Sequence, residues 1–266
     1  MSEAKPEPFT TPPLSPRAEA LSPGIRAGIA LAAPAIVAIL ISTLLNNLIS
    51  AADTSNGRSA TAVILGSAGL TSWLIGMLWY KVPGMGMRMK RPLFASVGFA
   101  VMGWVAYLIF HFFWVRLEGF GPAGSTQAFI YLILFEGFAV QIWTFGLFFR
   151  ALADWRGPLT AAVGSGLLFG MVAFLFFQES FYSNITSLIF FSLWGIFYGI
   201  IRLRTGSVLG TVLIQAMQSF TAWVVMVPAD MPPDQAAMQT VYLLSSAAFL
   251  IFVWRLWPKE VADYRV

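Results

Sequence analysis

The stretch LFASVGFAVMGWVAYLIFHFFWVR, residues 93–116, decides the fold. Apart from Tyr107, it contains one ionisable side chain, His111, before the terminal Arg116. About 20 apolar residues in helical form cross the roughly 30 Å hydrocarbon core of a bilayer. A β-barrel strand would need only about 10 residues, alternating between polar and apolar. The stretch therefore predicts a transmembrane helix, in which the backbone groups hydrogen-bond within the segment.

Seven further stretches share this character and predict an all-α polytopic membrane protein with about eight transmembrane helices. Apolar residues make up 58% of the 266 residues and charged residues only 11%, whereas a soluble domain has about 25% charged residues. A surface this poor in charge must face lipid. We expect spans near 27–50, 60–80, 93–116, 128–149, 158–177, 184–201, 207–228 and 238–257.

The basic residues between these spans predict the orientation in the membrane, because lysine and arginine accumulate in cytoplasmic loops. With both termini cytoplasmic, only Arg58 and Arg116 of the 16 basic residues fall on the outer side. The opposite orientation reverses this bias. We therefore expect an integral protein of a bacterial inner (plasma) membrane with its N-terminus and C-terminus in the cytoplasm.

Polar segments flank the expected transmembrane domain at 27–257. Residues 1–26 hold six of the fifteen prolines and predict a flexible cytoplasmic tail, because such a composition buries little apolar surface. They do not resemble a signal peptide, since the apolar run that follows is too long and lacks a cleavage pattern. Residues 258–266 predict a second, short cytoplasmic tail.

The residue types present exclude several kinds of chemistry. The chain has no cysteine and one histidine, which excludes disulfides, thiolate ligands and any site needing two imidazoles from one chain. We expect no metal and no cofactor. The basic residues recur between the spans and do not form one patch, which argues against nucleic acid and for membrane lipids as partners.

Polar side chains inside the spans are the candidate functional residues, since ionisable groups are costly in a membrane. Glu136 lies in the fourth predicted span, and Gln141 lies just over one turn further on. Gln215, Gln218 and Ser219 lie in the seventh span. We expect these side chains to point inward and hydrogen-bond with one another, because lipid offers no partners.

Other features have simpler interpretations. His111 lies among aromatic residues near the outer end of the third span and is expected to be an interfacial or packing residue. Glu179 follows the fifth span and is expected to be a solvated loop acid. Glycines four residues apart predict close helix packing rather than a hinge, and they are Gly166 with Gly170 and Gly195 with Gly199.

Three segments on successive core helices share a pattern with a known protease family: Glu136–Gln141, Phe169–Ala173 and Gln215–Ser219, with the turn Leu203–Ser207 before the last. They resemble the CAAX-protease and bacteriocin-processing family (CPBP, also called Abi) of intramembrane proteases. That family has Glu-Glu-x-x-x-Arg, then Phe-x-x-x-His, then His-x-x-x-Asn or Asp. The resemblance implies a CPBP-like core at about 128–228.

The catalytic motif that the resemblance implies is not intact here. In the family, glutamate is thought to activate a water, while the histidines and the Asn help to hold it and to stabilise the oxyanion. Loss of one oxyanion donor typically costs about 10²–10³ in rate. Glu136 and Phe169 are kept, and the positions that differ from the family pattern are Gly137 for Glu, Gln141 for Arg, Ala173 and Gln215 for His, and Ser219 for Asn or Asp.

These departures favour a pseudoprotease that serves as a membrane scaffold or as an assembly or regulatory subunit. Its former substrate cavity, near Glu136, Gln141, Gln215 and Gln218, would hold a transmembrane segment of another integral membrane protein, a lipid or an apolar cofactor. Two alternatives remain open. One is an active CAAX-type endopeptidase with a divergent site, and the other is a small transporter or channel with a polar core.

Overall fold

The computed structural model describes residues 14–49, 57–121, 125–177, 179–260 and 263–265. Helices account for most of these residues, as the sequence predicts. The elements are α1 (Pro16–Glu19), α2 (Pro23–Ile49), α3 (Gly57–Trp79), α4 (Lys81–Gly84), α5 (Arg91–Trp114), β1 (Leu117–Phe120), α6 (Ser125–Tyr131), η2 (Leu132–Ala139), η3 (Ile142–Phe148), α7 (Phe149–Arg156), α8 (Pro158–Phe176), α9 (Ile185–Thr205), α10 (Leu209–Phe220), η4 (Thr221–Val225), β2 (Met226–Pro228) and α11 (Gln235–Leu256).

Seven helical segments of the described chain are long and apolar enough to cross a membrane. The fourth runs over 31 residues, Thr126–Arg156, through α6, η2, η3 and α7. The sequence-based prediction ended this span at residue 149 and is wrong there. The helix continues because Arg150 is buried and its guanidinium lies 3.2 Å from the Asp154 carboxylate one turn further on.

The shorter apolar helix Leu209–Val225 is not among these seven, but it packs along α5. At one end, the Ser96 hydroxyl donates to the Ser207 carbonyl at 3.3 Å. Further along, the Trp104 indole donates to the Thr221 hydroxyl at 2.9 Å. At the other end β1 pairs with β2 in antiparallel register. The two segments therefore cover the same height side by side.

Helices α8 and α9 make the closest approach in the bundle, and glycine makes it possible. A Cβ built on Gly195 would lie 2.0 Å from the Gly166 carbonyl oxygen, and one on Gly199 would lie 2.1 Å from the Ala162 carbonyl oxygen. Any larger side chain would force the two backbones apart. The structure thus confirms the packing role predicted for these glycines.

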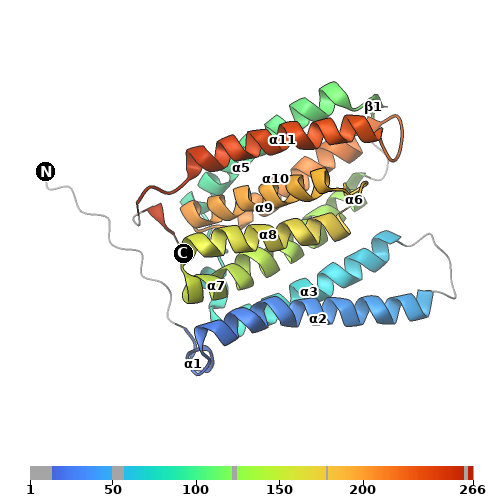
Figure 1. Ribbon diagram of the computed structural model, residues 1–266. Coiled ribbons are helices and arrows are strands. Elements are labelled where there is room, and N and C mark those ends of the chain that lie inside the picture. Colours follow the sequence, from blue (N-terminus) through green and yellow to red (C-terminus); the bar gives the residue numbers. More distant parts are fainter. Residues whose placement is uncertain (1–13, 50–56, 122–124, 178, 261–262, 266) are drawn as a thin grey trace, which may run out of the picture.

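The bundle has a central pair and two flanks (Figure 1). Helices α8 and α9 lie between α11 and α5 on one side and the α2–α3 hairpin on the other. The hairpin is anchored by the η3 helix, where the Trp143 indole donates to the Ala30 carbonyl at 3.2 Å. In Figure 1 the end of the hairpin that carries the α2–α3 connection lies away from the rest of the bundle.

Both ends of the described chain lie on one side of the bundle (Figure 1). Residues 1–13 of the predicted tail 1–26 lie outside the described residues. Further along, the Ser15 amide donates to the Trp79 carbonyl at 3.1 Å, and α2 begins at Pro23. Arg26 is buried because it pairs with Asp154 at 3.4 Å. At the other end, the Arg265 amide donates to the Leu203 carbonyl at 2.8 Å.

Candidate functional site

The polar residues predicted to form the site are carried by η2, by the residues between η2 and η3, and by α10. Glu136 and Gly137 lie in η2, whose backbone forms the wider turns of a π-helix, and Gln141 lies between η2 and η3. Short π-helical stretches within α-helices are frequent at functional sites. Helix α10 packs against η2, and the predicted site residues that it carries are Gln215, Gln218 and Ser219.

A chain of hydrogen bonds joins η2 to α10. The Thr211 hydroxyl donates to Gln141 Oε1 at 2.6 Å, Gln141 Nε2 donates to Gln215 Oε1 at 2.6 Å, and Gln215 Nε2 donates to the Glu136 carbonyl at 2.7 Å. All four side chains are buried. Of the groups expected to bond with one another, Gln141 and Gln215 do so, and Gln215 also reaches the Glu136 backbone. Gln218 has no hydrogen-bond partner among the described residues, and Ser219 bonds with Glu179 instead. Gln141 and Gln215, which stand where the family pattern has an arginine and a histidine, are thus hydrogen-bonded to each other.

Gly137 lies in close contact with α10 at the position where the resemblance places a second glutamate. A Cβ built on Gly137 would lie 3.1 Å from the Leu132 carbonyl oxygen and 3.3 Å from the Val212 carbonyl oxygen. Such contacts are tighter than a side chain normally makes, so a glutamate would require the backbone to move. The packing of η2 against α10 therefore suits glycine.

Phe169 and Ala173 lie elsewhere, in an aromatic cluster of α8 and α9. The Phe169 ring centroid lies 5.5 Å from that of Phe145, 5.6 Å from that of Trp194 and 5.9 Å from that of Tyr198. Both Phe169 and Ala173 are fully buried. The structure does not link them by hydrogen bonds to the Gln141–Gln215 pair within the described residues. Their environment is typical of a packed apolar core.

Glu179 is the residue that sequence reasoning misjudged, since it is buried and not solvated. Its carboxylate accepts hydrogen bonds from the Ser219 hydroxyl at 3.0 Å, the Trp223 indole at 3.0 Å and the Tyr107 hydroxyl at 3.2 Å. The Tyr242 hydroxyl also donates to the Glu179 backbone carbonyl. Burial raises the pKa of the Glu179 carboxyl, and the donors partly oppose that shift. No sequence pattern marked Tyr107 or Trp223.

His111 belongs to the same outer group. Its ring stands perpendicular to the Trp223 ring with centroids 4.6 Å apart, and the Tyr107 ring centroid lies 6.1 Å away. The side chain is fully buried. Of the two roles expected for His111, its contacts support packing.

The residues at the motif positions can be compared with what peptide hydrolysis requires. Peptide hydrolysis requires a base near a water together with donors aimed at the developing oxyanion. The Gln141 and Gln215 amides already bond with Thr211, with each other and with a backbone carbonyl. No group of three or more His, Cys, Asp or Glu side chains that could hold a metal ion occurs among the described residues.

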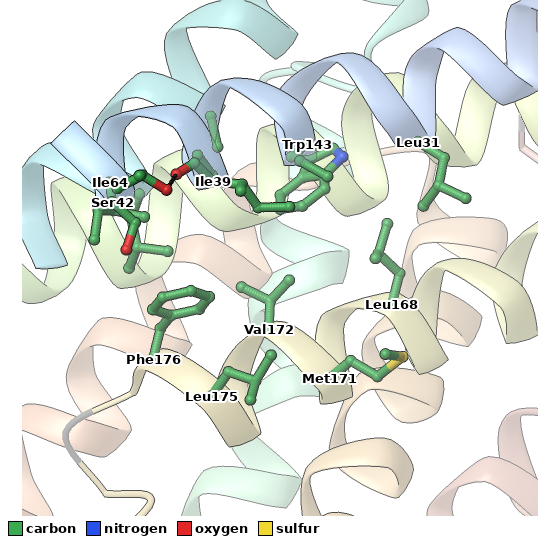
Figure 2. Close-up of a pocket in the computed structure, with 15 residues that line it drawn as sticks. Leu31, Ile39, Ser42, Ile64, Trp143, Leu168, Met171, Val172, Leu175 and Phe176 are labelled. Carbon is green, nitrogen blue, oxygen red and sulfur yellow. Dashed lines mark hydrogen bonds between the residues drawn. The ribbon is translucent and has the colours of Figure 1, made fainter. Parts of the chain in front are cut away.

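An apolar cleft of about 430 Å³ lies between α2, α3, η3 and α8 (Figure 2). Leu168, Val172 and Phe176 project from α8 toward α2, and Trp143 lies on the far side. None of the residues predicted to line a ligand cavity takes part in it, and they are Glu136, Gln141, Gln215 and Gln218. The expected cavity and this cleft are therefore different places.

Comparisons with known proteins agree with the resemblance drawn from the motifs. Residues 122–221 match the family model described as type II CAAX prenyl endopeptidase Rce1-like. The comparison with curated proteins gave no match. The matched segment contains η2, η3, α8, α9 and most of the α10–η4 span, which are the elements that carry all three motif segments. The core of this polytopic membrane protein, residues 122–221, is thus similar to the Rce1-like family of type II CAAX prenyl endopeptidases.

Proposed function

We propose that this protein is a pseudoprotease, which uses the CAAX-protease fold as a membrane scaffold and binds an apolar ligand without cleaving peptides. The observation that carries the proposal is the hydrogen bond between Gln141 and Gln215. At the two positions where the family pattern has an arginine and a histidine, this chain has two neutral amides that hydrogen-bond with each other.

The chemistry of these amides supports this proposal. A glutamine side chain does not titrate near neutral pH, so it cannot transfer the proton that general acid–base catalysis requires. It can donate a hydrogen bond to an oxyanion, but Gln215 Nε2 already donates to the Glu136 carbonyl at 2.7 Å. Releasing that bond inside the bundle would forfeit a buried hydrogen bond, at a cost of about 0.5–1.5 kcal/mol.

The packing supports the same proposal. Restoring a glutamate at Gly137 would bring a Cβ to 3.1 Å from the Leu132 carbonyl oxygen. Restoring a histidine at Ala173 would insert a ring into a fully buried position. Overpacking of this kind commonly costs about 1–3 kcal/mol. The surrounding helices are therefore fitted to the residues that this chain has.

The binding role follows from the fold and from the apolar cleft. A scaffold of spans that keeps only Glu136 of the family's catalytic residues can still hold a lipid, an apolar cofactor or a transmembrane segment of another integral membrane protein. We propose that it does so as an assembly or regulatory subunit in a bacterial inner membrane, with both termini cytoplasmic. The basic residues on the expected cytoplasmic side support that orientation.

Glu136→Gln tests whether the buried acid cleaves peptides. The purified protein and the variant are incubated in lipid nanodiscs with prenylated CAAX-type peptides and with transmembrane peptides, and products are measured by mass spectrometry. We expect no cleavage by either protein. Glu118→Gln, on the exposed strand β1, is the matched control. Cleavage by the wild type and by Glu118→Gln that disappears in Glu136→Gln would overturn the proposal.

An active protease with a divergent site is the second candidate, and one observation favours it. Gln215 bonds with the backbone of Glu136, while Ser219, one turn further along α10, bonds with the carboxylate of Glu179. Two buried acids therefore contact one face of the same helix. In this case Glu179→Gln should abolish cleavage as completely as Glu136→Gln in the same assay.

A further inference from the structure

The cleft between the α2–α3 hairpin and α8 has a shape and a lining that point to its occupant. Ala38 and Ile39 line it from α2, Trp143 from η3, and Val172 and Leu175 from α8. Ile39 and Leu175 are largely exposed, with 64% and 65% of their surface accessible. The cleft is therefore open along one side, toward what is bilayer hydrocarbon in a membrane-spanning bundle.

Water and empty space are both poor occupants of such a cleft. A water molecule needs several polar partners, and the Thr43 hydroxyl at the rim already donates to the Ile39 carbonyl at 2.9 Å. An empty space forfeits the dispersion contacts of all the side chains that line it. Hydrocarbon must fill the cleft, and the remaining question is whether it belongs to a protein helix or to a lipid.

Size decides between these two. A transmembrane helix is about 10–12 Å in diameter and about 30 Å long, which corresponds to a volume on the order of 2,000–3,000 Å³. The cleft has about 430 Å³. Only the tips of a few side chains of such a helix could enter it. A single hydrocarbon chain is thin enough to lie inside along its length.

We propose that this cleft is a binding site for one acyl chain of a phospholipid, which stays with the protein as a resident ligand. The chain contacts α2, η3 and α8 at once, whereas a lipid at the ordinary protein surface contacts one face. This contact area makes the site tighter than the surrounding annular positions. This inference rests on the proposed binding role and names the ligand that the scaffold would hold. Lipid retention is measured independently of peptide cleavage, so the two proposals can fail separately.

Filling the cleft tests the inference. Val172 is 4% exposed and projects from α8 into the cleft, so Val172→Trp should occupy the place of the chain. Leu250→Trp is the matched control, because Leu250 is 51% exposed on α11 at the opposite flank. Both proteins and the wild type are purified in mild detergent, and the phospholipid retained per chain is measured by mass spectrometry of extracted lipids.

We expect the wild type and Leu250→Trp to retain phospholipid equally and Val172→Trp to retain at least about tenfold less, which corresponds to about 1.4 kcal/mol of binding free energy. Ala38→Phe fills the cleft from α2 and should give the same loss. It replaces Val172→Trp if that variant fails to elute as a single folded species. Equal retention in all proteins would overturn the inference.

A second arm distinguishes the lipid from a protein partner. The chain has no cysteine, so Ala38→Cys provides a unique attachment point for a photocrosslinker in native membranes. We expect crosslinks to phospholipid acyl chains, which increase the protein mass by one lipid. Crosslinking to another polypeptide in their place would overturn the proposed occupant. Absence of peptide cleavage, by contrast, bears only on the pseudoprotease.

Discussion

Gln215 and Gln218 are one turn apart on α10, yet their surroundings differ. Gln215 accepts from Gln141 and donates to the Glu136 carbonyl. Gln218 is fully buried, and neither polar atom of its side chain has a hydrogen-bond partner among the described residues. A buried amide without partners carries the full cost of its desolvation. Glutamine therefore stabilises the bundle at position 215 and destabilises it at position 218.

Methionine, which has nearly the shape of glutamine, tests this contrast. Gln215→Met should lower the free energy of unfolding by about 1–3 kcal/mol, because Gln141 and the Glu136 carbonyl lose a partner. Gln218→Met should raise it by about 1 kcal/mol, because an unpaired amide is removed. Both are measured by chemical unfolding in the same detergent. Changes of the same sign in the two variants would contradict the contrast.

Glu179 should make the stability depend on pH. Burial raises the pKa of its carboxyl, so the folded protein keeps a proton that the unfolded chain has already released. This contribution to stability is fully present below the pKa of an unfolded glutamate, about 4.3, and is lost as pH rises through the higher folded pKa. Glu179→Gln should remove this decline, as seen in the midpoint of thermal unfolding from about pH 4 to about pH 8.

The control for that measurement is Glu118→Gln. Glu118 is exposed on β1, so this variant should keep the decline of the wild type with pH. A wild type whose stability rises over the same range would show that the donors from Ser219, Trp223 and Tyr107 outweigh burial.

Sequence reasoning at the residue scale succeeded where membrane burial leaves few choices. It predicted that Gln141 and Gln215 lie inside and bond with one another, because lipid provides no partners. It failed for Glu179, since a residue between two spans is usually solvated and nothing in the local pattern places it under Tyr107 and Trp223. Those contacts join α5, η4 and the turn after α8, and only the tertiary fold determines them.

At the scale of elements, apolar runs located the helices, but they did not predict their internal geometry. A hydrophobic run of about 20 residues predicts a span whether its turns are α-helical or π-helical. The wider turns of η2, η3 and η4 therefore had no signal in the pattern. Glycine spacing did carry information, because it predicted close packing of helix backbones. In the structure, a Cβ built on Gly195 would lie only 2.0 Å from the Gly166 carbonyl oxygen, so only glycine fits there.

The contact between α8 and α9 gives a prediction at this scale. Gly195→Ala should destabilise the bundle by about 1–3 kcal/mol, because its Cβ would overlap the Gly166 carbonyl and push α8 and α9 apart. Gly98→Ala on α5 is the control, since nothing lies within 4 Å of the position of its added Cβ. That variant should be neutral or more stable by about 0.5–1 kcal/mol, through helix propensity alone. Thermal unfolding of both variants in one detergent measures the difference.

Equal effects of the two substitutions would contradict this account of the α8–α9 interface. A loss in Gly195→Ala that Gly166→Ala reproduces would support it, because the Cβ of Gly166 would meet the Ile196 backbone at 2.5 Å. The two variants approach the same interface from opposite helices. Their effects should therefore not add when combined.

At the scale of the whole molecule, the number of spans decides on which side each loop lies. Composition and the lengths of the apolar runs predicted about eight spans, and the structure agrees, with seven long helices and the shorter Leu209–Val225 segment. The side that faces the cytoplasm follows from the positions of the basic residues, and it stays a prediction. The pairing of β1 with β2 requires the α5 and η4 ends to share one side.

Single cysteines in this cysteine-free chain test both statements. Glu118→Cys and Asp230→Cys lie on the side of β1 and β2, where the Ala229 amide donates to the Arg116 carbonyl at 2.9 Å, and both positions are exposed. Lys90→Cys and Lys259→Cys lie on the side of the described chain ends. An impermeant maleimide should label the first two in intact cells and the last two only after permeabilisation. If Asp230→Cys labels together with Lys90→Cys, the Leu209–Val225 segment does not cross the membrane. If Lys90→Cys and Lys259→Cys are labelled in intact cells and the other two only after permeabilisation, the number of spans is supported. The cytoplasmic side has then been predicted wrongly from the basic residues.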